Sequence, residues 1–232
     1  YEAEGRYAEA GAMLDRAAAN APQRNDLLEQ RALVLIKAGD FDGAVEVYRT
    51  LAARRLSAAD YQLRIAEVLY QADRPAEAEA WLGQVLAAEQ IHNCRLIDAA
   101  KLAERFHRPA ISRLYADRAI AMAAKDPITH DLSDDLLTLW LRAQLTDHGV
   151  SAALAEIRSL RERVWTVYTT AHPAGRYALK NNLDRIDRVL QGWFSTWLAD
   201  NATVAQRDEA LGPLSEMYAA SFDAAADNFN NV

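Results

Sequence analysis

Apolar residues recur along this chain at the three- and four-residue spacing of helices that bury one face. Over residues 152–170 the pattern comprises Leu154, Ile157, Leu160 and Val164. No segment alternates convincingly between apolar and polar residues with a period of two, the pattern of a half-buried strand. Glycine and proline, which interrupt helices, number only 9 and 6 among 232 residues. The chain is therefore predicted to be all-α, with no sheet.

Comparison of the chain with itself reveals a repeat of 34 residues. Two sets of alanines follow this interval: Ala32, Ala66 and Ala100, and Ala10, Ala44 and Ala78. Small residues at fixed positions let two antiparallel helices approach closely, while larger side chains fill the flanks. One such hairpin cannot bury its own apolar face, so neighbouring hairpins must stack into a solenoid.

The repeat resembles the tetratricopeptide repeat (TPR), a helix–turn–helix unit, over about residues 1–126. The family pattern has a small residue in helix A, glycine at the turn, an aromatic residue after it and a small residue in helix B. The second repeat carries these features as Ala32, Gly39, Phe41 and Ala44. In the third repeat Asp73 replaces the turn glycine. The resemblance implies a right-handed α-solenoid of about four to five helix pairs, followed by C-terminal capping helices.

The 34-residue register fades after Pro127. We therefore expect TPR repeats over residues 1–126, and over 127–232 a degenerate TPR-like hairpin and C-terminal helices that pack on the solenoid. Gly149 is predicted to break the hairpin. The segment His172–Gly175 is predicted to end its second helix.

The last two helices are predicted over about residues 176–199 and 204–229. Trp193 and Trp197 lie four residues apart on the apolar stripe of the first of these, so we expect both in the core. Phe194 lies less clearly on the stripe and is predicted to be more exposed.

The first repeat has its turn at Gly5, so most of its helix A falls outside the sequence. We therefore expect the chain to be a fragment of a larger protein, with any signal or anchor lying upstream. The single cysteine, Cys94, excludes an internal disulfide and is compatible with both the cytoplasm and a bacterial periplasm. The compartment stays open between these two.

The formal net charge is −7 and the pI is near 5.3. Because duplex nucleic acid is bound through Lys and Arg on its phosphates, an acidic chain argues against that role. No apolar run approaches the roughly 18 residues that a membrane span needs. We expect a protein or peptide partner, no nucleic acid and no membrane span within this sequence. A polysaccharide partner stays open, although nothing in the residues supports it.

Residue types that carry catalysis or bind metals are present but poorly arranged for either. Cys94 and His92 are two residues apart, and residues at that spacing on a helix face different directions. The five histidines include no pair at the four-residue spacing of helical zinc sites. Gly-rich phosphate loops and Gly-x-Ser-x-Gly are absent from the sequence. The sequence predicts no catalytic site, no metal site and no cofactor.

The TPR resemblance implies a non-catalytic scaffold whose A helices line a concave groove for peptides or partner proteins. Carried over position by position, the groove residues are Asp26, Glu29, Leu33, Ile36 and Lys37, then Asp60, Leu63, Glu67, Tyr70 and Gln71, then Cys94, Ile97, Lys101, Glu104 and Arg105. We expect them to grip an extended or helical peptide by apolar anchors with charged edges. The alternative is that the C-terminal helices cover them.

One TPR subclass is argued against by these positions. TPR domains that clamp the C-terminal carboxylate of chaperones have Lys and Asn where the second repeat has Glu29 and Leu33. An acidic and an apolar side chain do not hold a carboxylate. Two other interpretations stay open: the TPR arm of a bacterial envelope or polysaccharide-export assembly, and a helical accessory region of a larger enzyme.

Overall fold

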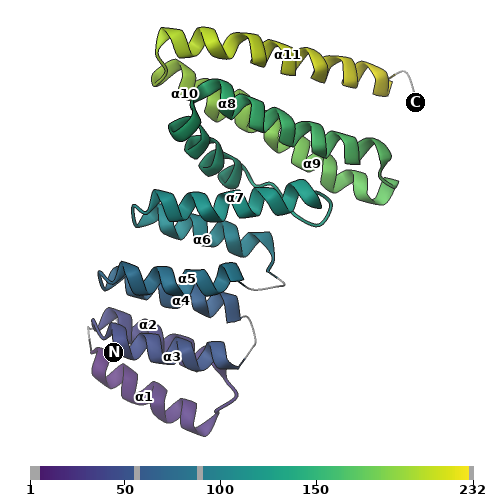
Figure 1. Ribbon diagram of the computed structural model, residues 1–232. Helices are drawn as coiled ribbons and strands as arrows, with labels where there is room; N and C mark the ends of the chain where they lie inside the picture. The colour runs from purple at the N-terminus through teal and green to yellow at the C-terminus, as the bar shows by residue number, and fades with distance from the viewer. Residues whose placement is uncertain (1–5, 55–57, 88–90, 230–232) are drawn as a thin grey trace. The chain divides into compact units, whose positions relative to one another are not determined.

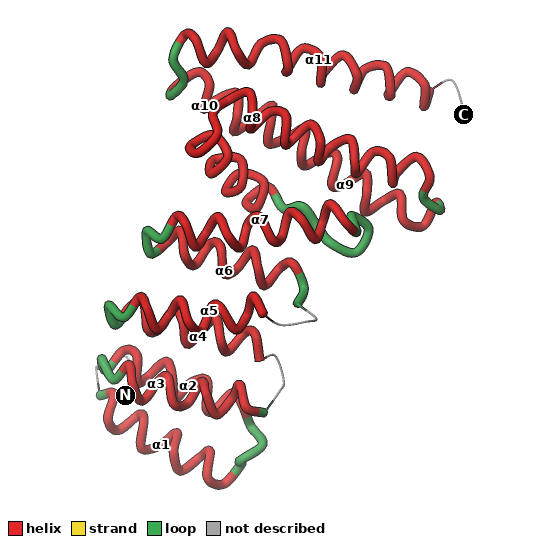
Figure 2. Tube along the Cα trace, viewed as in Figure 1, coloured by secondary structure: helices red, strands yellow, loops and turns green. Residues whose placement is uncertain are grey.

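The structure, a computed structural model, describes residues 6–54, 58–87 and 91–229, with side chains up to Met217. These residues form helices joined by short turns and contain no strand, which confirms the all-α prediction (Figures 1 and 2). They fall into two compact units, residues 1–111 and 112–232, and each is described by itself. The domain boundary expected at residue 126 stays a prediction. The turn expected at Gly5 lies outside the described residues.

The first unit is a stack of consecutive helices. These are α1 (Tyr7–Asn20), α2 (Asn25–Lys37), α3 (Phe41–Ala53), α4 (Ala58–Gln71), α5 (Pro75–Ala87), α6 (Asn93–Arg105) and the start of α7 (Pro109–Lys125). From α1 to α5 each helix packs on the next one, and α6 packs on both α4 and α5. This consecutive pairing is the packing of an α-solenoid, as expected.

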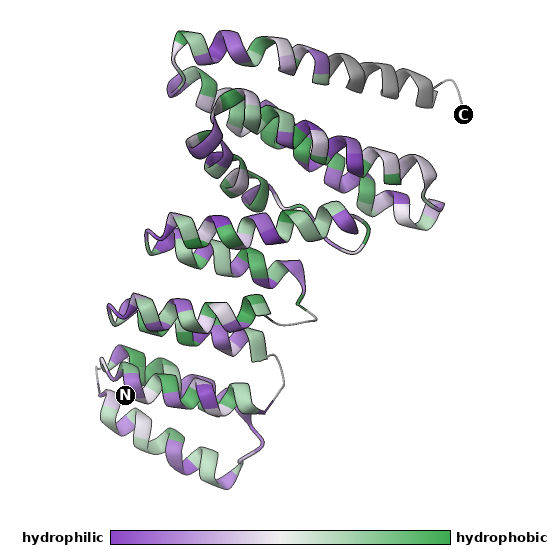
Figure 3. Cartoon of the chain, viewed as in Figure 1, coloured by the Kyte–Doolittle hydropathy of each residue, from purple (hydrophilic) through white to green (hydrophobic). Residues whose placement is uncertain are grey.

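The alanines at the repeat interval lie where helices meet. Ala32, Ala66 and Ala100 are fully buried, and so are Ala44 and Ala78. A side chain of one methyl group lets the neighbouring backbone approach, and the larger apolar residues around it fill the remaining space. Figure 3 shows the resulting mixture of hydrophobic and hydrophilic residues along each helix of the unit.

Ala10 differs from the other members of its set because it is only half-buried. It lies on α1, which packs on α2 and has no buried residue among those described. The equivalent alanines in α3 and α5 lie on helices that pack against two neighbours. Equivalent positions of the repeat are therefore equally buried only where their helix packs against a helix on each side.

Three turns share one backbone conformation at intervals of 34 residues. Gly39, Asp73 and His107 have positive φ values of 79°, 57° and 57°. After each, the next amide donates to a carbonyl five residues earlier, as Asp40 N does to Leu35 O at 2.9 Å. This pattern is a Schellman motif, which satisfies the last carbonyls of a helix. The repeat thus fixes the turn even where aspartate or histidine replaces glycine.

The second unit contains the rest of α7, α8 (Asp134–Thr170), α9 (Pro173–Val189), the π-helical turn η1 (Leu190–Phe194), α10 (Ser195–Asp200) and α11 (Val204–Phe229). Gly149, with φ 81° and ψ −179°, divides α8 into two helical segments, as expected. The second segment ends at Thr170, which agrees with the helix end expected at His172–Gly175. The next helix begins earlier than the expected residue 176: Pro173 opens α9, where its missing N–H costs nothing, and His172 Nδ1 accepts from Ala174 N at 3.4 Å.

A buried amide anchors the connection between α7 and α8. Asn182 on α9 accepts a hydrogen bond from Leu132 N at 2.9 Å through Oδ1. Its Nδ2 donates to Pro127 O at 2.8 Å and to His130 O at 3.2 Å. One side chain therefore satisfies three backbone groups that would otherwise be buried without partners.

The π-helical turn changes which aromatic residue enters the core, and the expectation for this helix was wrong. Phe194 is fully buried, whereas Trp193 and Trp197 are only half-buried. A π turn takes in one more residue than an α turn. The face that holds Leu190 therefore continues at Phe194, where a regular helix would have shared it with Trp193.

Candidate functional site

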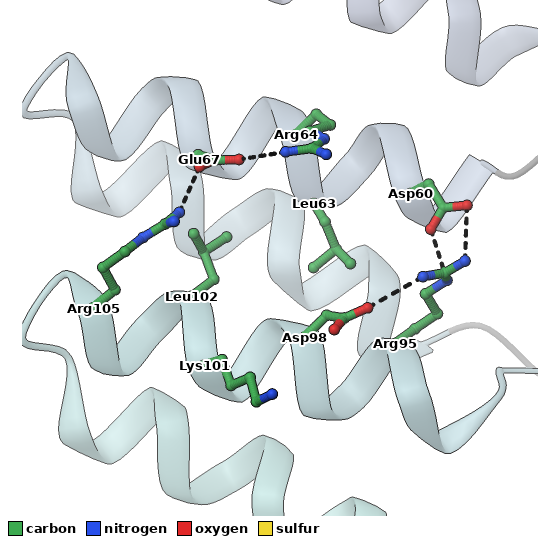
Figure 4. A pocket seen from close by; sticks show the side chains of 9 residues that line it. All are labelled: Asp60, Leu63, Arg64, Glu67, Arg95, Asp98, Lys101, Leu102 and Arg105. Atoms are coloured by element: carbon green, nitrogen blue, oxygen red, sulfur yellow. Dashed lines mark hydrogen bonds and ion pairs between the residues drawn. The ribbon is translucent and has the colours of Figure 1, made fainter. Parts of the chain in front are cut away.

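A groove of about 620 Å³ runs along α4 and α6 in the first unit (Figure 4). It is lined by four residues of α4 and five of α6, most of them charged: Asp60, Leu63, Arg64, Glu67, Arg95, Asp98, Lys101, Leu102 and Arg105. These two helices are the A helices of neighbouring repeats, so residues some 34 positions apart are brought to one surface. Leu63 and Leu102 are buried, and they form the apolar floor between the charges.

One end of the groove is organised around Glu67. Its Oε1 pairs with Arg105 Nη2 at 2.5 Å and its Oε2 pairs with Arg64 Nη1 at 3.1 Å. The Glu67 side chain is 21% exposed, against 63% for Arg64 and 57% for Arg105. The acid is thus covered by its two partners, whose guanidinium groups remain open to solvent. Lys101 lies one helical turn before Arg105 and lines the same groove.

The other end of the groove is organised around Arg95. Its Nε and Nη2 lie 2.7 and 3.0 Å from the two carboxylate oxygens of Asp60, a bidentate pair. Its Nη1 lies 3.1 Å from Asp98 Oδ2. Two acids on one guanidinium make this end the more acidic one, so charge changes sign along the groove.

A smaller hollow of about 340 Å³ continues the surface toward α2 and shares Asp60 and Arg64 with the groove. Its other lining residues are Glu29, Leu33, Tyr48 and Tyr61. The Tyr61 hydroxyl donates to Glu29 Oε1 at 2.7 Å. Burial, together with the Glu29 carboxylate, raises the pKa of Tyr61 to about 12. Leu33 stays 52% exposed and gives this hollow an apolar contact.

The residues expected in the groove divide into three groups by burial. Exposed side chains are those of Asp26, Glu29, Leu33, Lys37, Gln71, Cys94, Lys101 and Arg105, and half-buried ones are those of Ile36, Asp60, Glu67 and Glu104. Leu63, Tyr70 and Ile97 are buried within the unit. Five expected residues, Asp60, Leu63, Glu67, Lys101 and Arg105, lie together in the larger groove. Glu29 and Leu33 lie in the adjoining hollow.

The expectation from sequence missed several lining residues that the repeat interval itself points to. Tyr61 and Arg95 are equivalent positions 34 residues apart, and so are Arg64 and Asp98. In both cases the two equivalent positions carry different residue types, so a search for identical residues at the repeat interval does not find them. Extending the comparison to every polar A-helix position would have found them.

The second unit has its own groove of about 690 Å³ along α7 and α8. Arg113 pairs there with Asp147, and its Nη2 lies 3.0 Å from His148 Nε2. Trp140 lies in its wall and is buried. The charged lining residues of this groove include the cations Arg113, Lys125 and Arg163 and the acids Asp117 and Glu156.

The part of the chain that is described holds no cluster of metal-ligand side chains. No three or more His, Cys, Asp and Glu side chains gather there in a way that suits a metal ion. Across the described ranges, no helix has both the length and the apolar character needed to cross a membrane.

Residues 35–91 match the model of the tetratricopeptide repeat family. This segment runs from the end of α2 to Ile91, just before α6, and includes two of the three positive-φ turns. The match supports the assignment to tetratricopeptide repeats that the sequence pattern suggested. None of the curated proteins compared with the chain matches it. The repeat class indicates a protein-interaction scaffold, and such repeats are generally not catalytic.

Proposed function

We propose that this chain binds a segment of a partner protein along the exposed faces of α2, α4 and α6. The observation that carries the proposal is the continuity of the groove and the smaller hollow, which share Asp60 and Arg64. Together they offer exposed charges and one exposed apolar side chain, Leu33, on the helices that the repeat pattern assigns to the inner face. Hot spots of protein recognition combine such apolar contacts with charged edges.

The dimensions of this surface suit a short segment. Packed helices lie roughly 8–10 Å apart, so three helices in a row span about 20 Å. An extended chain rises about 3.3 Å per residue, so about six residues cross them. The charged side chains described above are held in ion pairs across the two walls, which keeps the surface in shape before a partner arrives.

The proposal is tested by selecting a random library of dodecapeptides on the whole 232-residue chain. Peptides that bind in the proposed place lose affinity when Leu33→Asp is introduced, because a charge replaces the apolar contact. The matched control is Leu114→Asp in α7, since Leu114 is 48% exposed and lies outside both surfaces. Retention of binding by Leu33→Asp, or failure to select any peptide, overturns the proposal.

A further inference from the structure

The cationic end of the groove, formed by Arg64, Glu67 and Arg105, presents charge of one sign to solvent. Both oxygens of Glu67 are taken by guanidinium groups from different helices. The acid is about one-fifth exposed, while each arginine is more than half exposed. A ligand reaching this end therefore meets N–H donors before it meets a carboxylate.

From this asymmetry, and resting on the proposed function, we infer that the partner segment carries acidic side chains that dock on Arg64 and Arg105. A guanidinium has five N–H donors in a planar fork. Pairing with one Glu67 oxygen leaves each arginine further donors for a carboxylate, which accepts two parallel bonds from such a fork. Lys101 lines the same groove and adds a third cation to it.

The rest of the surface sets the direction of the segment. Toward α2 the hollow contains Glu29 and the exposed Leu33. Glu29 repels a carboxylate, and Leu33 offers a contact to an apolar side chain. We therefore place the acidic residues of the segment over α4 and α6, and an apolar residue over Leu33. This differs from a clamp for a chain-terminal carboxylate, because an acidic side chain within a segment is enough.

A basic segment fits this end poorly. Its lysine or arginine would have to displace Arg64 or Arg105 from Glu67, whereas a carboxylate binds without breaking either pair. A nucleic acid also carries groups that guanidinium binds, but its many phosphates would meet the acidic remainder of a chain with net charge −7. A protein segment with few acidic residues places its charge only where the arginines are.

The test uses the dodecapeptides selected on the whole chain. We expect aspartate and glutamate to be enriched over lysine and arginine in the binders, and a Glu→Gln version of the best binder to bind more weakly. Arg105→Gln and Arg64→Gln should each weaken the acidic binder about tenfold, since each removes charge-assisted hydrogen bonds to the carboxylate. Arg49→Gln is the matched control: Arg49 forms a similar pair with Glu46 within α3, is 54% exposed, and lies outside both surfaces.

Glu67→Gln separates recognition from support of the fold. Removing the covered acid raises the positive charge of this end, so the acidic binder should associate several-fold faster at low salt, whereas a structural role alone predicts no faster association. Circular dichroism shows whether each variant keeps its helices. Binders without acidic enrichment that still require Leu33 overturn this inference and leave the proposed function standing. Tighter binding of a uridine dodecanucleotide, lost in Arg105→Gln, also overturns it.

Discussion

Tyr70 and Phe106 stack with their ring centroids 4.9 Å apart and their planes inclined by 12°. The Tyr70 hydroxyl is buried and has no hydrogen-bond partner among the residues that the structure describes. Burial raises the pKa of this hydroxyl. The stack thus ties the end of α4 to the residue that follows α6, while one polar atom stays unsatisfied.

Tyr70→Phe should therefore stabilise the protein. The variant keeps the ring stack and removes a buried hydroxyl whose desolvation costs about 1–3 kcal/mol. We expect the urea midpoint to rise and peptide binding to stay unchanged. Tyr70→Ala, which loses the ring, should lower stability by about 3 kcal/mol or more. A lower midpoint for Tyr70→Phe would show that the hydroxyl has a partner.

Alanine should have opposite effects at two glycines of the first unit. Gly39→Ala should destabilise by about 1 kcal/mol, because its φ of 79° is unfavourable for a residue with Cβ. Gly83→Ala lies within α5, with nothing within 4 Å of the added Cβ, and should stabilise by about 0.5–1 kcal/mol. Denaturant unfolding of both variants measures the two signs. Equal signs would contradict the role given to the turn.

Asn182→Asp should unfold the second unit more easily than Asn181→Asp. The aspartate at 182 lacks the amide that donates to Pro127 O and His130 O, and both carbonyls stay buried beside a charge. The expected loss is about 3 kcal/mol, in the range for breaking a buried polar network. Asn181 is the neighbouring control because it is half-buried. Hydrogen exchange over residues 126–133 checks whether the connection between α7 and α8 loosens.

Phe194→Ala should destabilise far more than Trp193→Ala. Phe194 is fully buried and stacks on Trp197 with centroids 5.9 Å apart. Loss of a buried phenylalanine costs about 3–5 kcal/mol, and the half-buried Trp193 should cost clearly less. Thermal unfolding of the two variants ranks them. The reverse order would contradict the burial of Phe194.

The Tyr61 hydroxyl should titrate near pH 12, because burial and Glu29 raise its pKa to about 12. The folded pKa lies above the usual value of about 10. The stabilising contribution is therefore complete below pH 10 and is lost as the pH rises toward 12. Tyrosinate absorbance of the protein, compared with Tyr61→Phe, isolates this group. Glu29→Gln should lower its pKa, and an unchanged titration would contradict the contact.

The fold of the first unit could be predicted because its information is local and repeated. Ala32, Ala66 and Ala100 are fully buried at equivalent positions, where neighbouring helices approach closely, so the repeat interval predicts all three. Residue type alone does not identify the turns at Asp73 and His107. Only their position in the 34-residue repeat marks them as equivalents of Gly39.

Features of the second unit escaped prediction because their causes lie far apart in sequence or within one irregular turn. Asn182 binds backbone groups 50 to 55 residues earlier, which no local pattern reveals. The turn at residues 190–194 moves Phe194 inward, although a regular helical period favoured Trp193. In the first unit the family resemblance named five of the nine residues that line the groove, but the charges at unlike equivalent positions, such as Arg64 and Asp98, needed the structure.

The double attachment of Glu67 has a consequence for the kinetics of docking. Its two bonds reach one arginine on its own helix and one on the next repeat, so both guanidinium planes are already oriented. Immobilising a long side chain on binding costs about 0.5–1.5 kcal/mol. A partner segment that binds the remaining donors of these two arginines avoids much of this cost, because both side chains are already ordered. Binding of the partner segment then requires little rearrangement of Arg64 and Arg105.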